Sequence, residues 1–214
     1  WSNPSSPYRT GSRVRAKIEQ AREEWAGFFS FKRDQIIFTS GATEANNAIF
    51  AHFSKGLGLK GSCLVSPFEH PSVIDSAKYW FDQKIIYMPT DGKGLVNLNE
   101  TSSILEKEKI SLVSLMAANN ETGVLQPWQE LAEVCSRNGV YFHCDATQWV
   151  GKLDTSGLSN CGSFSASARE FCGPKGVGWL ATKAPVKMQL GGAQEFGLRG
   201  GTENYPAIAS MMVA

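Results

Sequence analysis

The chain opens with a stretch in which apolar side chains recur every three or four residues. From Ser12 onward, Val14, Ile18, Ala21, Trp25 and Phe28/Phe29 stand at this spacing among charged and amide side chains. This periodicity predicts an amphipathic helix that lies on a hydrophobic core.

Short apolar runs separated by helical stretches follow this first helix. We expect strands at residues 35–39, 63–66, 85–88, 111–117, 140–145 and 177–182, and helices at residues 40–53, 73–81, 99–107 and 127–138. Glycines break the chain at residues 56–61. Strands that alternate with helices at this spacing predict parallel βαβ units. The expected fold is therefore α/β, with a central sheet covered on both faces by helices.

Composition and charge narrow the range of partners. The 214 residues, 42% of them hydrophobic, can bury one substantial core, and no linker or repeat divides them, so we expect one domain over residues 1–214. A net charge of +1, from 21 basic and 20 acidic residues, gives no field that would gather nucleic acid or an anionic membrane. No long apolar run or secretory signal is present, which favours the cytoplasm or an organelle matrix. A small-molecule or protein partner is expected.

The cysteines and the two ends of the chain give further expectations. Five cysteines, an odd number without CxxC spacing, argue against a disulfide framework and a tetrahedral zinc site, so no metal is expected. The chain starts at Trp1 in a polar run and stops at Ala214 within an apolar stretch, so both ends are interpreted as cut. The chain is then a fragment, a degenerate product, or a polypeptide that completes itself against a partner.

Polar residues follow several of the predicted strands. In an open α/β sheet, ligands bind beyond the carboxyl ends of the strands, which is where Thr43, His70, Asn120 and Asp145 fall. The glycine-containing turn before Ala42 and Thr43 offers free N–H groups and a helix dipole to a phosphate, although many such turns are only capped helices.

Each of the other polar residues has two interpretations. His70 could stack on an aromatic ring or move protons, or it could simply cap a helix before Pro71. Asp145 could pair with a pyridinium N–H, or it could cap the following turn. Gln148 could reach a ring oxygen, or it could be solvated.

Six motifs occur in an order that is more specific than any one of them. The chain resembles the cysteine desulfurases, a NifS-like branch of the class V aminotransferases, in the motifs Ser-Gly-Ala-Thr-Glu-Ala-Asn-Asn, Glu-His, Asn-Asn-Glu-Thr-Gly-x-x-Gln-Pro, Cys-Asp-Ala-Thr-Gln, Gly-Pro-Lys-Gly-Val-Gly and Gly-Gly-Ala-Gln-Glu-x-Gly-Leu-Arg-Gly-Gly-Thr-Glu-Asn. The resemblance covers nearly the whole chain. It implies the large domain of a pyridoxal 5′-phosphate (PLP) dependent transferase of fold type I, with a mainly parallel, seven-stranded sheet.

The resemblance also implies roles for particular residues. The phosphate of PLP would be held by Ala42 and Thr43, with Gln148 and Ser167 nearby. His70 would stack on the pyridine ring, Asn120 would lie beside the ring hydroxyl and the substrate, and Asp145 would pair with the ring nitrogen. Such proteins are homodimers that act on L-cysteine and pass sulfur to an acceptor protein, and Thr202 would reach the phosphate in the other subunit.

One segment departs from the pattern of this family. Where the cysteine desulfurases carry a His-Lys pair before Gly-Pro-Lys-Gly, this chain has Arg169 and Glu170. The lysine of that pair forms the Schiff base with PLP, and Lys175 does not align with it. The catalytic cysteine loop, the arginine that grips the substrate and the small C-terminal domain would lie beyond residue 214, and an N-terminal segment would precede Trp1.

A carboxylate at position 170 cannot form an imine and brings a negative charge toward Asp145 and the cofactor. Two like charges about 4 Å apart repel by roughly 4 kcal/mol at an effective dielectric constant near 20. We therefore expect Glu170 to turn away, to become protonated, or to pair with a cation such as Arg169. The alternative is that Arg169 and Glu170 are solvated charges on an unselected loop.

Three functions from different classes follow. The first is a desulfurase-like domain that keeps the PLP pocket but is inactive alone, with Glu170 non-functional. The second is a fragment or altered form of an active cysteine desulfurase. The third is a non-catalytic protein that binds the cofactor, or docks as a scaffold on a true desulfurase.

Overall fold

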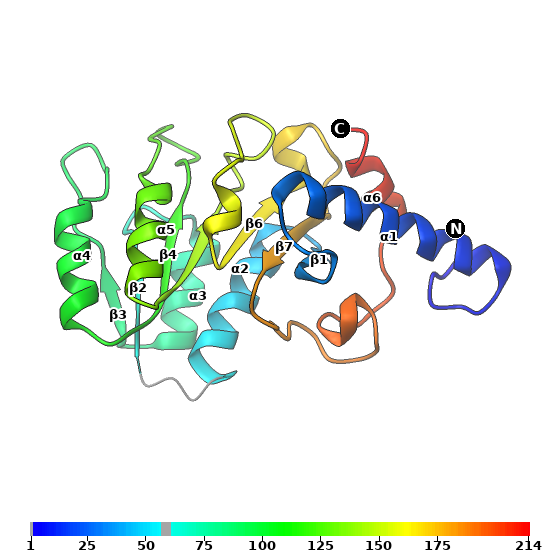
Figure 1. The fold of residues 1–214 in the computed structure, drawn as a ribbon, viewed down its shortest axis with the longest axis horizontal. Coiled ribbons are helices and arrows are strands. Elements are labelled where there is room, and N and C mark those ends of the chain that lie inside the picture. The colour runs from blue at the N-terminus through cyan, green and yellow to red at the C-terminus, as the bar shows by residue number, and fades with distance from the viewer. Residues whose placement is uncertain (1, 57–60) are drawn as a thin grey trace.

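A computed structural model describes residues 2–56 and 61–214 of the chain. The predicted glycine break at residues 56–61 falls largely on residues 57–60, which lie outside the described residues. The described residues form one seven-stranded sheet with helices packed against it (Figure 1).

The strands lie in the order β1-β7-β6-β5-β4-β2-β3. Their bounds are β1 (Ile36–Thr39), β2 (Ser62–Val65), β3 (Ile85–Tyr87), β4 (Ile110–Met116), β5 (Tyr141–Asp145), β6 (Ser163–Ser167) and β7 (Gly178–Thr182). The strands from β6 to β3 pair in parallel, whereas β7 is antiparallel to both β1 and β6. The fold class is thus the predicted α/β, with a mainly parallel sheet.

Strand β7 is the antiparallel member of this mainly parallel sheet. Only residues 168–177 separate β6 from β7, and a parallel crossover needs roughly a dozen residues or more. The connection is too short to return the chain to the opposite end of the sheet, so β7 runs backward.

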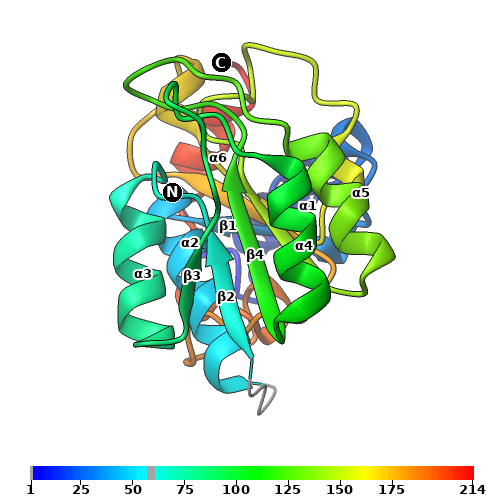
Figure 2. The same cartoon turned by 90° about the vertical axis from the view of Figure 1, so that its left-hand side faces the viewer.

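The helices cover both faces of the sheet. Their bounds are α1 (Arg9–Phe29), α2 (Ala42–Ala51), α3 (Pro71–Phe81), α4 (Leu98–Lys107), α5 (Trp128–Arg137) and α6 (Tyr205–Met211), and the short turns are η1 (Arg33–Gln35), η2 (His52–Gly56), η3 (Leu158–Asn160), η4 (Ala168–Phe171) and η5 (Glu195–Gly197). Seen along the sheet, α2 and α3 lie on one side and α1, α4 and α5 on the other (Figure 2). Separate hydrophobic clusters fill the two sides.

Helix α5 shows how the sequence specifies these layers. Trp128, Leu131, Ala132 and Cys135 are all buried, and their spacing places them on one face of the helix. Burying a large apolar side chain contributes about 1.5–3 kcal/mol. Gly139 follows the helix with a φ of 66°, a left-handed conformation that ends the helix at little steric cost.

A buried ion pair joins α1 to the segment that follows β7. Arg22 donates to both carboxylate oxygens of Glu195, over 2.6 and 2.8 Å, and both side chains are 1% exposed. Arg22 also donates to the carbonyl oxygen of Ile36 at 2.6 Å, and the N–H of Phe38 donates to Glu195 at 2.9 Å. The pair therefore fixes both α1 and η5 against β1.

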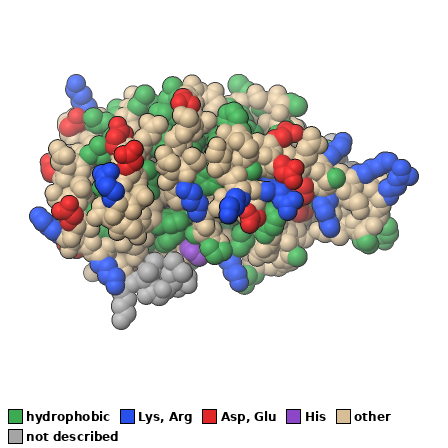
Figure 3. Space-filling view, in the orientation of Figure 1, with side chains coloured by type: hydrophobic (Ala, Val, Ile, Leu, Met, Phe, Trp, Pro, Cys, Tyr) green, Lys and Arg blue, Asp and Glu red, His purple; other side chains and the backbone are tan. Residues whose placement is uncertain are grey.

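The surface carries charges of both signs. Basic and acidic side chains are interspersed over the face in Figure 3.

Among the described residues, no helix is both long enough and apolar enough to cross a membrane. Of the five cysteines, four are buried and Cys172 is exposed, all as free thiols.

Candidate functional site

A cavity of about 410 Å³ opens beyond the carboxyl ends of the strands. It gathers eight of the residues that the sequence singled out, namely Ala42, Thr43, His70, Asn120, Asp145, Gln148, Ser167 and Glu170. Its volume lies within the range of about 300–1,000 Å³ that is usual for small-molecule sites. Thr202 does not line it, but lines a second cavity of about 190 Å³. The two cavities share Ser40 and Gly176 in their walls.

The first turn of α2 forms one wall of the cavity. Gly41 precedes the helix with a φ of 147°, and among the described residues no side-chain cap hydrogen bond is found at this N-cap. The first N–H groups of an α-helix have no partner within the helix, so those of Ala42 and Thr43 can donate to an anion. The acidic residue of this turn, Glu44, accepts from Ser40 N–H at 2.7 Å and from Arg199 Nε at 2.8 Å. Burial alone would raise the pKa of Glu44, but hydrogen bonds from Arg199 and Ser40 lower it.

Asp145, at the end of β5, is held by a side-chain amide from α2. Asn46 Nδ2 donates to Asp145 Oδ2 at 2.8 Å and to Ser72 Oγ at 2.9 Å. Asn46 Oδ1 contacts His143 Nε2 at 3.0 Å and accepts from Ser165 Oγ at 2.7 Å. The other oxygen of Asp145 accepts from the N–H of Thr147 at 3.0 Å, which is the turn-capping contact considered from the sequence. The Asp145 carboxylate is therefore fixed and buried.

A second carboxyl group lies buried near Asp145. Glu69 Oε1 accepts from Met116 N–H at 2.6 Å, whereas Oε2 is buried without a hydrogen-bond partner among the described residues. Burial, and to a lesser extent the charge of Asp145, raise the pKa of Glu69 to about 8. At neutral pH Glu69 is therefore mostly protonated, which limits the negative charge on this side of the cavity.

His70 forms the N-cap of α3. Its Nδ1 accepts from Ser72 N–H at 3.1 Å and lies 2.9 Å from Ser72 Oγ. The neutral ring therefore carries its proton on Nε2, since Nδ1 is the acceptor. The capping interpretation of His70 is seen directly, and the ring also lines the cavity.

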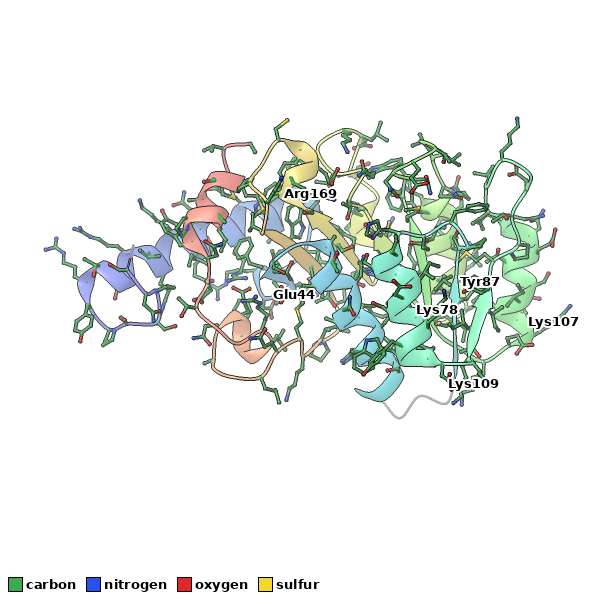
Figure 4. All side chains as sticks on the ribbon, turned by 180° about the vertical axis from the view of Figure 1, so that it is seen from behind. Glu44, Lys78, Tyr87, Lys107, Lys109 and Arg169 are labelled. Atoms are coloured by element: carbon green, nitrogen blue, oxygen red, sulfur yellow. The ribbon has the colours of Figure 1, made fainter. Side chains whose placement is uncertain are left out.

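Glu170 and Arg169 lie in η4, directly after β6. Glu170 Oε1 pairs with Arg169 Nε at 2.9 Å, and Glu170 Oε2 accepts from Gln148 Nε2 at 2.9 Å. The expected pairing with Arg169 is seen. The Glu170 side chain is 18% exposed, and that of Arg169, which is labelled in Figure 4, is 59% exposed.

The residues present fit a phosphorylated pyridine. The uncapped turn of α2 suits the phosphate, and the fixed Asp145 carboxylate suits a protonated ring nitrogen. Thr147 Oγ1, on a residue that lines the cavity, is buried and has no hydrogen-bond partner among the described residues. A buried hydroxyl without a partner is unfavourable, and a bound ligand would satisfy it.

A family comparison agrees with this geometry. The sequence profile of the family described as aminotransferase class-V matches residues 2–213. The chain belongs to the class-V aminotransferase family.

Relatives within the class-V aminotransferases include cysteine desulfurases. The chain is 38% identical to cysteine desulfurase IscS of Dictyoglomus turgidum, over 99% of this chain and 55% of that protein. It is 36% identical to the mitochondrial cysteine desulfurase of Candida albicans, over 98% and 45% of the two chains. A solved NifS-like protein superposes with a TM-score of 0.90 at 35% identity, covering 99% of this chain and 60% of that one. The chain thus spans about half the length of the curated relatives it matches.

Sequence reasoning missed several residues that shape this class-V site, above all Asn46 and Glu69. Asn46 did leave a signal, because it shares the buried face of α2 with Ala42, Ala45 and Ile49. An amide on the apolar face of a predicted helix indicates a buried hydrogen-bond network. Glu69 left a weaker signal, because a charged residue in a loop, here the one between β2 and α3, is usually solvated.

Proposed function

We propose that this chain is a cysteine desulfurase-like domain that binds PLP without a covalent bond and does not release sulfur from L-cysteine by itself. The observation that carries the proposal is the Glu170 carboxylate in the wall of the cavity, held by Gln148 and Arg169. In the pattern of the cysteine desulfurases, this position is a lysine.

The residues of the cavity have the chemistry to bind the cofactor. The N–H groups of Ala42 and Thr43 would receive the phosphate, with Ser167 nearby. His70 would stack on the ring, Asn120 would lie beside the ring hydroxyl, and Asp145 would hold the ring N–H. When bound, PLP supplies an electron sink for charge that develops at a substrate carbon. Gln148 would sit further from the phosphate than expected, because Glu170 and Lys152 already bind its amide.

Thr202 supports the proposal that the protein is a homodimer. It lines a smaller cavity that shares Ser40 and Gly176 with the main one. In a dimer of the kind that the resemblance implies, Thr202 would reach the cofactor phosphate of the other subunit. A sulfur-acceptor protein or a true desulfurase would then be the protein partner, in the cytoplasm or an organelle matrix.

A second candidate function is favoured by the extent of the similarity. The chain spans 55% of the Dictyoglomus relative and 45% of the Candida relative. A longer protein that contains this sequence would have room for a nucleophilic cysteine and for the substrate-binding arginine. In that case the chain is part of a PLP-dependent cysteine desulfurase altered at position 170.

Three measurements on the purified chain separate these functions. Titration calorimetry with PLP should show binding, absorption spectra should show no imine, and incubation with PLP and L-cysteine should release no sulfide. Asp145→Asn should weaken PLP binding about tenfold or more, because a hydrogen bond to a charged group contributes about 1.5–3 kcal/mol. Asp75→Asn, at an exposed position of α3, is the matched control.

Other outcomes would contradict the proposal in distinct ways. Sulfide release by the chain alone would show an active enzyme. Absence of PLP binding in both the unmodified chain and the control would instead favour the scaffold function.

A further inference from the structure

Donors and charges of both signs line the main cavity. The first turn of α2 offers donors to an anion, and Asp145 and Glu170 present carboxylates from two different segments. Two cations also line the cavity: Arg169, which pairs with Glu170, and Lys175, to which no hydrogen bond or ion pair is found within the described part of the chain. The α2 turn can receive one phosphate, and the two carboxylates can each accept from a cationic group of the same ligand.

Glu170 retains acceptor capacity for such a ligand. A carboxylate offers about four lone-pair sites, and within the described residues two are used, by Arg169 and by Gln148. The Arg169 side chain is 59% exposed, so water screens its attraction to Glu170. A cation inside the cavity, away from bulk water, would be held more strongly than Arg169 is.

The phosphorylated forms of vitamin B6 differ in the group on one ring carbon. The aldehyde form, PLP, is neutral there and gains most by forming an imine with an amine. The aminomethyl form, pyridoxamine 5′-phosphate, carries an ammonium group that donates to carboxylates. Together with its protonated ring nitrogen, this ammonium gives the second of the two cations that the cavity matches.

We infer that the cavity selects pyridoxamine 5′-phosphate over PLP, with Glu170 receiving the ammonium group while Asp145 holds the ring N–H. This inference rests on the proposed function, because it needs the same cavity to bind the B6 ring and phosphate. Glu170 then has a function of its own, because it determines which form of the cofactor is bound.

Calorimetric titration of the full chain with three ligands tests the inference. The ligands are pyridoxamine 5′-phosphate, PLP, and pyridoxine 5′-phosphate, which carries a neutral hydroxymethyl group. The amine should bind about tenfold or more tighter than the neutral ligand, which corresponds to one charge-assisted contact. Glu170→Gln should reduce this preference to about threefold or less, chiefly by weakening the binding of the amine. Glu121→Gln, at an exposed position outside the cavity, should keep the full preference.

A second variant tests whether residue 170 reaches the same ring carbon. Glu170→Lys mixed with PLP and then reduced with borohydride should carry the cofactor on the peptide that contains position 170, as seen by mass spectrometry. Unmodified chain treated in the same way should carry none there.

The failures of the two proposals are distinguishable. Equal affinity for all three ligands, or a preference that survives Glu170→Gln, overturns the inference while the B6 pocket stands. Absence of binding by all three ligands overturns both. Melting temperatures of the variants close to that of the unmodified chain establish that a lost preference is not a loss of folding.

Discussion

The side-chain amide of Gln148 donates a hydrogen bond to Oε2 of Glu170 at 2.9 Å. This contact ties the turn after β5 to η4 after β6, and so it keeps the Glu170 carboxylate in the wall of the cavity. Arg169, whose side chain is 59% exposed, binds the other oxygen of Glu170.

The Arg169–Glu170 pair should contribute little to stability. Arg169 is 59% exposed, and exposed ion pairs typically contribute about 0–1 kcal/mol. Arg169→Ala should therefore lower the free energy of unfolding by less than about 1 kcal/mol in urea titrations. A loss several times larger would mean that Arg169 supports η4 in some further way.

The Arg22–Glu195 pair should be much more sensitive to the loss of one partner than the Arg169–Glu170 pair. Its N–O distance of 2.6 Å is also short, but both side chains are 1% exposed. Arg22→Ala leaves the Glu195 carboxylate buried without its partner, at a cost of about 3–5 kcal/mol. The double variant Arg22→Met with Glu195→Leu should lose clearly less than Arg22→Ala, because no charge stays buried. Urea unfolding of the three proteins checks this order.

Asn46→Ala should be among the most damaging changes in α2. The Asn46 amide makes hydrogen bonds with the side chains of Asp145, Ser72, His143 and Ser165. Its loss therefore leaves several buried polar groups without a partner. Each buried polar group without a partner costs about 1–3 kcal/mol, and we expect a total loss of at least about 3 kcal/mol. Asn47→Ala, at the exposed neighbouring position, is the control and should change the melting temperature only slightly.

Glu69 should make the protein less stable as the solution becomes alkaline. Its pKa is raised from 4.5 to about 8 in the fold. Between these values the folded state binds more protons than the unfolded state, so the free energy of unfolding falls as pH rises. The full effect is on the order of a few kcal/mol, since one pKa unit corresponds to about 1.4 kcal/mol.

A second buried group, His143, limits the pH range in which the effect of Glu69 on stability can be measured separately. Burial lowers the pKa of His143 from 6.5 to about 4, so His143 makes stability rise with pH up to about 6.5. Of these two groups, only Glu69 changes the free energy of unfolding above pH 6.5, and its effect ends near pH 8. Glu69→Gln should abolish the fall between these two values, whereas Glu106→Gln, on the exposed side of α4, should keep it. Equal slopes in both variants would show that another group is responsible.

The sequence predicts the architecture better than the details of the site. Apolar periodicity located α1, α3, α4 and α5 and six of the seven strands to within a few residues, because each of those elements buries an apolar stripe or run. It missed β6, whose sequence Ser-Phe-Ser-Ala-Ser lacks the continuous apolar run that marks other strands of this sheet. Ser163 and Ser165 are fully buried there because His143 and Asn46 bind their hydroxyl groups.

Contacts between distant residues were the main feature that the sequence could not give. Positions after predicted strands placed Ala42, Thr43, His70, Asn120 and Asp145 around one cavity, because parallel strands bring their carboxyl ends together. Ser167 and Glu170 came instead from the resemblance to the cysteine desulfurases. The same reasoning could not show that the Gln148 amide donates to Glu170. Nor could it show that Glu69 is buried beside Asp145, which depends on how two loops pack.

The buried pair of Arg22 and Glu195 has one more consequence. Strand β1 is the last in the sheet, and its outward-facing backbone would otherwise invite another chain to add a strand. The Arg22 guanidinium donates a hydrogen bond to the carbonyl oxygen of Ile36, and the Glu195 carboxylate accepts one from the N–H of Phe38. A neighbouring strand would make hydrogen bonds to the same two backbone groups. The side chains of Arg22 and Glu195 thus satisfy backbone groups that an added strand would use. The ion pair that holds α1 against β1 therefore also protects this edge of the sheet from aggregation.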